Sequence, residues 1–192
     1  MFGMLMARCG RQRKLRFLLI ALGLGLVPVA GAQVSNFNEN RLLNSWFEIA
    51  RLPNKSQRTC VANSSNLITR GETKGELRWL WVCTDTLDNT QTHLVSAKPT
   101  GVPGTGSYRA RVLWLVWHHN YQVVDVAADN SWMVLGTPNR KKLWIYSAKP
   151  KMDAMLLSEL RSRAEHAGYN TSRLITQPQT NPAKSATATE LK

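Results

Sequence analysis

The side chains whose types and spacing could carry out chemistry are few in this sequence. Its histidines are His93, His118, His119 and His166. Neighbouring residues of a strand point to opposite sides, so His118 and His119 would not share a metal ion. The closely spaced carboxylates are Asp85 with Asp88 and Asp125 with Asp129. Both pairs lie in or beside expected turns, where a solvated aspartate is ordinary. We therefore expect no metal site.

The sequence also lacks the motifs of common enzyme classes. It contains no Gly-X-Ser-X-Gly elbow, no phosphate-binding loop and no Cys-X-X-Cys pair. A free thiol at Cys60 or Cys83 that faced a cavity would be the one remaining nucleophile, which keeps an enzyme open as an alternative. Otherwise we expect a protein that is not an enzyme and that uses no cofactor.

Cys60 and Cys83 are also a candidate disulfide pair. Export would place them in an oxidising compartment, where disulfides persist, although both could instead be small buried side chains. In a simple hairpin register Cys60 would face Thr84, one residue away from Cys83. The bond therefore needs a β-bulge or a different turn.

The first 32 residues have the pattern of a secretory signal peptide. Five basic residues precede the apolar run FLLIALGLGLVPVA, and the small-residue site Ala30-Gly31-Ala32 follows it. The run is short for a membrane-spanning helix, so we expect cleavage after Ala32, with an uncleaved anchor as the alternative. The third cysteine, Cys9, precedes the run. This order predicts an exported, soluble protein of the periplasm or cell envelope, with no lipidated cysteine at the cleavage site.

Charge points to no single partner. Removing the expected signal takes away five of the 25 Lys and Arg and none of the 12 Asp and Glu, which leaves a formal charge of +8. The basic residues are scattered, which is typical of a solvated surface. Such an excess could still favour peripheral contact with an anionic membrane surface, or a nucleic acid bound by a basic β-barrel.

Short β-type runs recur about every ten residues after Ser45, separated by Gly, Pro, Asn and Asp. Eight strands are expected, at 45–52, 59–69, 76–85, 91–98, 108–117, 121–127, 131–136 and 142–148. The short connections predict that consecutive strands are antiparallel neighbours. The fold class is therefore all-β, with an up-and-down antiparallel β-barrel.

The periodicity changes after Pro150. Met152, Met155, Leu156, Leu160 and Ala164 form one apolar stripe, which predicts a C-terminal α-helix at about 151–167. Gly168 followed by an aromatic residue fits a helix cap. The composition of residues 179–192 is small and polar, which predicts a disordered tail. The domain organisation is thus a signal at 1–32, a barrel with its helix at 33–178, and a tail at 179–192.

A closed eight-stranded barrel is wide enough for one small ligand. The strand at 76–85 and the stretch at 111–126 are apolar on both faces. Their inward side chains could line an apolar calyx or could fill the interior, and the sequence leaves both interpretations possible. The candidate ligand-binding residues are Leu77, Trp79, Trp81, Val112, Trp114, Val116 and Tyr121.

Three stretches resemble the lipocalin family, in its bacterial and apolipoprotein-D-like branch. One of them, NYQVVDVAADNSWMVLG at 120–136, is similar to the family's paired strands around a short acidic turn. Asn44-Ser45-Trp46-Phe47-Glu48-Ile49 matches the opening Gly-X-Trp motif, with Asn44 in place of glycine. The stretch LWIYSAKP at 143–150 is similar to the motif that precedes the family's helix. There Ala148 stands where an arginine usually packs over the first-strand tryptophan. The resemblance covers residues 37–178.

By this resemblance Trp46 plugs the closed end of the barrel. The resemblance also implies a carrier of fatty acids, lysophospholipids or similar amphiphiles, in lipid transport or membrane maintenance. The alternatives are a lipocalin-like enzyme with a cavity thiol and a basic barrel that binds nucleic acid; we expect no nucleic acid partner.

Overall fold

The computed structural model describes residues 36–111 and 118–186. Eight strands of these residues form the barrel wall, and their ends lie within three residues of the predicted ones wherever the chain is described. They are β1 (Asn44–Arg51), β2 (Cys60–Arg70), β3 (Leu77–Asp85), β4 (Thr90–Pro99), β5 (Ser107–Arg111), β6 (His118–Val126), β7 (Trp132–Gly136) and β8 (Leu143–Ser147).

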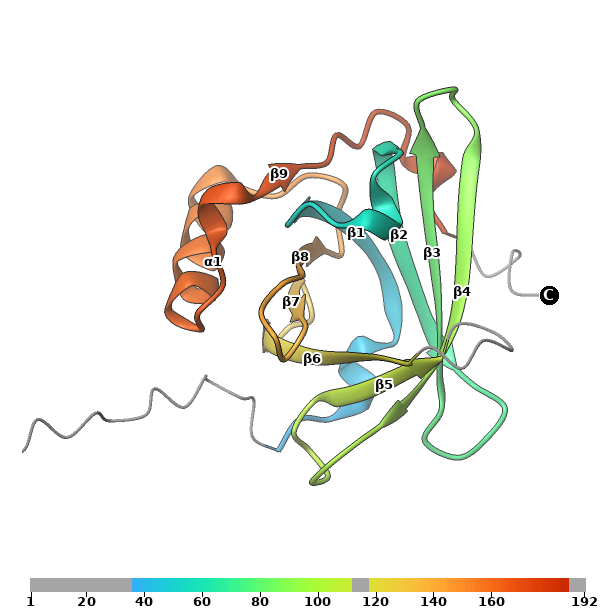
Figure 1. Cartoon of the computed structure of the whole chain (residues 1–192), viewed down its shortest axis with the longest axis vertical. Helices are drawn as coiled ribbons and strands as arrows, with labels where there is room; N and C mark the ends of the chain where they lie inside the picture. The colour runs from blue at the N-terminus through green and yellow to red at the C-terminus, as the bar shows by residue number, and fades with distance from the viewer. Residues whose placement is uncertain (1–35, 112–117, 187–192) are drawn as a thin grey trace, which may run out of the picture.

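The strands close into a single barrel (Figure 1). Each strand from β2 to β7 pairs antiparallel with the next one in the chain, and β1 closes the ring by pairing with both β8 and β2. This is the up-and-down order that the short connections predicted. Closure removes the exposed sheet edges of the barrel wall.

An irregularity in β1 determines what its second half presents to the interior. The register between β1 and β8 shifts between Glu48 and Ala50. In a regular strand, residues three apart point to opposite faces. Because of the shift, Glu48 and Arg51 lie close enough for a buried ion pair, while Ala50 packs on the outside under the helix.

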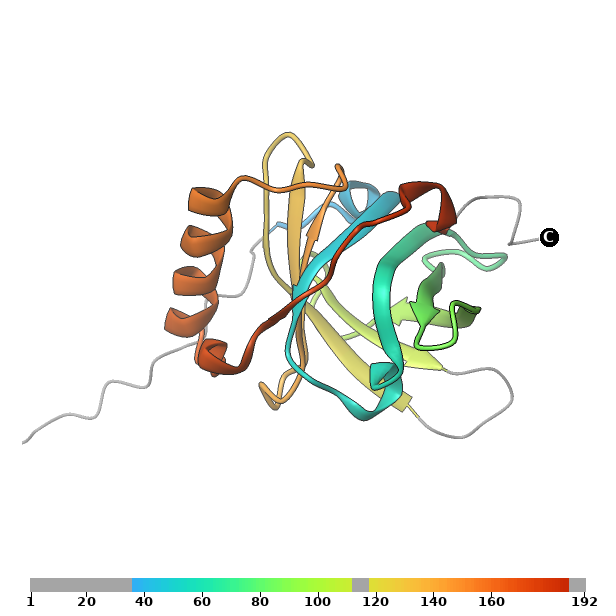
Figure 2. The ribbon, with the colours of Figure 1, turned by 90° about the horizontal axis from the view of Figure 1, so that it is seen from above.

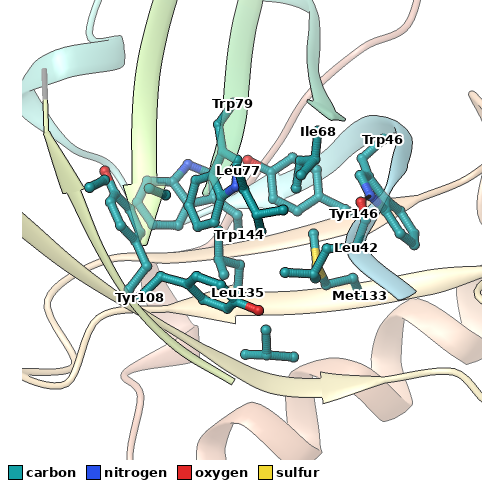
Figure 3. Close-up of a cluster of buried hydrophobic side chains, with 14 of the residues drawn as sticks. Leu42, Trp46, Ile68, Leu77, Trp79, Tyr108, Met133, Leu135, Trp144 and Tyr146 are labelled. Carbon is teal, nitrogen blue, oxygen red and sulfur yellow. Dashed lines mark hydrogen bonds between the residues drawn. The ribbon is translucent and has the colours of Figure 1, made fainter. Parts of the chain in front are cut away.

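Aromatic side chains fill much of the barrel (Figure 3). Trp79 is fully buried, with its ring centroid 5.7 Å from that of Tyr108 and 5.2 Å from that of Tyr121. Leu77 belongs to the same interior cluster. The deeper half of the barrel is therefore a packed core.

The closed end is capped by the short 3-10 helix η1 (Glu39–Leu42). Trp46 is fully buried, and its Nε1 donates to the carbonyl oxygen of Leu42 at 2.8 Å. Two guanidinium groups contact this end of the barrel: Arg41 donates to the carbonyls of Val126 and Ala127, and Arg70 donates to the side chain of Asn40.

The two motif positions at which this chain departs from the family pattern, Ala148 and Asn44, both have ordinary backbone conformations. Ala148 is partly buried beside the interior cluster, and its N–H donates to the carbonyl of Ser131 at 2.9 Å. Asn44 begins β1 and is not among the described residues with positive φ. Asparagine tolerates left-handed backbone better than most residues, which would make it a mild substitute for glycine, but position 44 does not require this tolerance.

The helix α1 (Ala154–His166) lies against the outside of the barrel (Figure 1). It is shorter than predicted because Asp153 acts as the N-cap, where its side chain accepts from two helical N–H groups. Leu160 and Ala164 of the helix are buried against the barrel. Met155 is 82% exposed, so the prediction that it belongs to the apolar stripe was wrong. Gly168, at φ 91°, ends the helix.

No helix in the ranges 36–111 and 118–186 has the length and apolar character needed to cross a bilayer. The remaining helical elements of these ranges are single 3-10 turns. They are η2 (Lys55–Gln57), η3 (Thr171–Arg173) and η4 (Pro182–Lys184).

The C-terminal strap, residues 175–186, departs from the expected tail (Figure 2). It begins as β9 (Ile175–Thr176), which pairs with β1, and continues across to β2. Asn63 of β2 donates its N–H to the carbonyl of Pro178 and accepts from the N–H of Asn181. The prediction of disorder was therefore wrong for 179–186, because polar side chains of the strap satisfy backbone groups where β1 and β2 diverge. Residues 187–192 lie outside the described ranges.

Candidate ligand-binding site

A cavity of about 190 Å³ lies at the end of the barrel opposite Trp46. Its apolar walls come from the inward faces of four strands: Trp81, Val95, Tyr121 and Trp144. Its polar lining includes Gln57, Gln91, His93, His119 and Lys142. At about 30 Å³ for each water-sized group, the cavity holds roughly six such groups. It is smaller than the 300–1,000 Å³ of ordinary ligand pockets.

Three aromatic rings pack against one another in the cavity wall. The ring of Trp81 stacks on that of Trp144, with centroids 6.1 Å apart, and lies 5.7 Å from that of Tyr121. The Nε1 of Trp81 donates to the hydroxyl of Tyr146 at 3.1 Å, below the cavity. These contacts hold flat apolar surfaces in place for an aliphatic or aromatic ligand.

A buried ion pair lies beside the cavity. Arg51 Nη1 is 2.6 Å from Glu48 Oε1, and both side chains are at most 3% exposed. Burial raises the pKa of Glu48 above its ordinary value, while the charge of Arg51 and hydrogen bonds from Arg51 and Gln57 act in the opposite direction. Arg51 also donates to the carbonyls of Gln57 and Cys60, which ties the β1–β2 loop to the barrel.

The mouth carries positive charge without a counterion. Lys142 is half-buried at the rim, and no carboxylate of the described residues lies within ion-pair distance of it. Burial lowers the pKa of Lys142, and burial together with Lys142 lowers that of His119. An anionic group placed at this rim would relieve both effects.

A disulfide forms part of the cavity wall. Cys60 and Cys83 are bonded, with their Cα atoms 5.6 Å apart. Leu67 pairs with Leu80 rather than with Leu77, so a regular ladder would place Cys60 opposite Leu87. Two register shifts in β2 move it to a position opposite Asp85, two residues nearer to Cys83. The bond leaves neither sulfur free as a thiol nucleophile.

The predicted ligand-binding residues divide into three groups. Trp81 and Tyr121 line the cavity. Leu77 and Trp79 point inward as expected, but they belong to the packed core below it. Val112, Trp114 and Val116 lie outside the described residues.

Several lining residues were not predicted. Trp144 and Tyr146 face inward and Ile145 faces outward, but the strand is continuously apolar, so the sequence does not indicate which of its faces is the inner one. Gln57 and Lys142 come from loops. His119 lines the cavity while His118 faces the outside, as the strand alternation implied.

A larger hollow of about 760 Å³ lies on the outer surface of β3, β4 and β5. It is lined by charged side chains from the outward-facing positions of these strands, including Arg78, Lys98, Arg109 and Arg111. Glu72 and Glu76 lie at one edge. Hydroxyls of Ser96 and Thr73 donate to Glu76 and hold its pKa at about 2. This outer groove is charged and shares only Val95 with the cavity, so it does not suit an apolar ligand.

A closed barrel of eight antiparallel strands, with an apolar cavity at one end and one helix outside, defines a class of small-ligand-binding proteins. The model of the lipocalin-like domain matches residues 38–179, and the chain belongs to this family. Proteins of the family bind small hydrophobic ligands.

The chain is similar to two bacterial proteins named outer membrane lipoprotein Blc. It is 24% identical over 169 residues to the protein of Citrobacter freundii, covering 83% of this chain and 89% of the relative. It is 25% identical over 163 residues to that of Vibrio cholerae, covering 78% and 86%.

Solved structures share the fold at low identity. Lobster apocrustacyanin A1 superimposes with a TM-score of 0.60 at 13% identity, covering 75% of this chain and 81% of that one. The cockroach allergen Per a 4 also gives 0.60 at 13% identity, covering 78% and 93%.

The bacterial relatives correct the predicted localisation. They are named as outer membrane lipoproteins, and a lipoprotein of this kind carries lipid on a cysteine. The expectation of a soluble protein without a lipidated cysteine was therefore wrong. Its error lay in treating the position of Cys9 before the apolar run as decisive. Cys9 and the rest of the segment 1–32 lie outside the described residues.

Proposed function

We propose that the protein binds a small single-chain amphiphile, such as a fatty acid, in the cavity at the open end of the barrel, and that it is a carrier rather than an enzyme. The observation that supports this proposal is the aromatic wall of Trp81, Tyr121 and Trp144 beside Lys142, which has no ion-pair partner among the described residues. An apolar wall with a basic rim suits an aliphatic chain that ends in a carboxylate. Lipid transport or membrane maintenance in the cell envelope is the corresponding role.

The size of the cavity sets the expected chain-length dependence. Each buried methylene contributes about 0.8 kcal/mol, or roughly fourfold in affinity. We expect affinity to rise with length up to about six carbons and then to level off, because the cavity holds roughly six such groups. Longer ligands, including lysophospholipids, require the cavity to enlarge.

Fluorescence titration of delipidated protein with fatty acids of about four to twelve carbons tests this proposal. Saturable quenching of tryptophan at about 1:1 stoichiometry is expected, since two indoles line the cavity. Lys142→Ala should weaken carboxylate binding by roughly threefold to tenfold, whereas Lys141→Ala, its exposed neighbour outside the cavity, should not. Folded protein that binds none of these ligands would refute the carrier function.

The outer groove favours a second contact, with an anionic membrane surface. Arg78, Lys98, Arg109 and Arg111 gather there, on the opposite side of the barrel wall from the cavity. Charges concentrated on one face attract anionic lipid and are screened by salt.

Sedimentation with vesicles checks the membrane contact. We expect binding to phosphatidylglycerol vesicles at low salt and none to phosphatidylcholine vesicles. The double charge reversal of Arg109 and Arg111 to Glu should abolish it. Reversal of Lys149 and Lys151, two exposed lysines between β8 and α1, makes the same change in net charge and should reduce binding much less. Equal loss in both double variants would show that only net charge matters.

A further inference from the structure

Gln57 belongs to the β1–β2 loop, but its side chain forms hydrogen bonds with two side chains of the barrel strands. Its Nε2 donates to Glu48 Oε2 at 2.8 Å, and its Oε1 accepts from Trp144 Nε1 at 2.7 Å. The same oxygen accepts from Asn54 Nδ2 at 2.9 Å. Gln57 also lines the cavity. The carboxamide of Gln57 therefore donates one hydrogen bond to the barrel wall and accepts another from it.

The two barrel partners are held in place by contacts of their own. Glu48 is 1% exposed and is paired with Arg51. Trp144 is 2% exposed and packs against Trp81 and Tyr121. Without a partner, a buried carboxylate oxygen and a buried indole N–H would each cost free energy. This pair of groups therefore requires a bound group that offers a donor and an acceptor together.

We propose that Glu48 and Trp144 form a head-group subsite of the cavity, filled here by the carboxamide of Gln57, and that a ligand with a neutral donor–acceptor head, such as a primary amide, binds by displacing Gln57. The inference rests on the proposed function, since it concerns the same cavity. It adds a class of ligand that the basic rim alone does not select.

The charge at the subsite decides which heads it accepts. The Glu48 carboxylate accepts a hydrogen bond from Gln57, so a carboxylate head in the same position would meet like charge in a poorly solvated environment. The charge of Arg51 is already paired with Glu48. Neutral heads therefore bind at Glu48 and Trp144, while anionic heads bind at the rim beside Lys142.

Displacement of Gln57 also enlarges the cavity. Gln57 lies in η2, and this short helix is connected to the barrel mainly through Gln57 and the guanidinium of Arg51. When its carboxamide leaves the subsite, the space it occupies becomes available to the ligand. Amides should therefore be bound with longer chains than carboxylates.

The test compares octanamide with octanoate by calorimetry, using the full chain and the variants Gln57→Ala and Trp144→Phe. The readout is the ratio of the two dissociation constants, because a change in cavity volume alone moves both ligands equally. Gln57→Ala removes the competing carboxamide and should shift the ratio about tenfold in favour of the amide. Trp144→Phe removes the donor and should shift it about fivefold against the amide.

Gln122→Ala is the matched control. Gln122 is also a glutamine of the barrel wall, but its side chain donates to Tyr169 on the outer side, so the ratio should not change. Thermal unfolding of each variant establishes that it is folded. The combined Gln57→Ala and Trp144→Phe variant should lose the gain of the first substitution.

The possible outcomes separate the two proposals. If both ligands bind but the ratio is the same in every variant, the subsite is overturned and the carrier function stands. If neither ligand binds to the folded parent or to any variant, the carrier function itself fails. A ratio that shifts in opposite directions in Gln57→Ala and Trp144→Phe supports the subsite.

Discussion

Replacing Arg51 with Met is expected to destabilise the protein by about 3–5 kcal/mol at neutral pH. The substitution removes the only cation within ion-pair distance of Glu48 among the described residues, and it leaves a buried carboxylate with Gln57 as its side-chain donor. It also frees the carbonyls of Gln57 and Cys60, to which Arg51 donates. Urea unfolding followed by circular dichroism measures the loss.

The loss should depend on pH in a defined direction. Burial places the pKa of Glu48 above its ordinary 4.5, and removal of Arg51 raises it further. Below 4.5 the carboxyl is neutral in both the folded and the unfolded chain, so the cost of burying its charge is absent. As the pH rises from 4.5 towards the raised folded-state pKa, that cost grows, and above the folded-state pKa it is fully present. The deficit of the variant should therefore shrink as the solution is acidified.

A second substitution provides the control. When Glu48 is replaced by Leu in the Arg51→Met variant, no unpaired charge remains, and stability should return to within about 2 kcal/mol of the parent. A deficit of Arg51→Met that stays below about 1 kcal/mol at neutral pH would contradict the role of the pair. A deficit that does not vary with pH would contradict the assignment of the cost to Glu48.

Loss of the disulfide is expected to cost about 3 kcal/mol. The bond joins residues separated by 23 positions, and its removal restores the freedom of that loop to the unfolded chain. The double variant Cys60→Ala, Cys83→Ala should show this loss in urea unfolding under oxidising conditions. Adding a reductant should lower the stability of the parent by a similar amount and leave the variant unchanged.

Counting the reactive thiols tests directly whether the disulfide is present. Denatured, non-reduced protein should show no maleimide-reactive thiol at Cys60 or Cys83. Two reactive thiols at these positions would refute the bond and would reopen the enzyme alternative, since the pair lies at the cavity wall.

Much of the barrel was predictable because its signals are local. Strand alternation depends only on neighbouring residues, and it correctly placed Leu77, Trp79 and Trp81 on one inward face. Turn residues marked the hairpins, and Gly168 marked the end of the helix. The fold class followed from the order and spacing of these signals.

The candidate site was less predictable because it depends on contacts between distant segments. Gln57 has no sequence signal that connects it with Trp144, which lies 87 positions away. The strap bonds to Asn63 across more than 100 residues, although its composition is that of a disordered tail. Polar composition predicts disorder only where no partner is available, and here backbone groups of β1 and β2 supply one.

The sequence by itself determined the barrel, its strand order and the inward direction of its alternating residues, since a period of two residues is an intrinsic property of an extended chain. Only the tertiary structure decided the β1 irregularity that brings Glu48 and Arg51 together, and the β2 shifts that align the two cysteines. It also decided how much of the interior the aromatic side chains leave empty. Register and cavity volume depend on how side chains from many strands pack at once, and no local pattern carries that information.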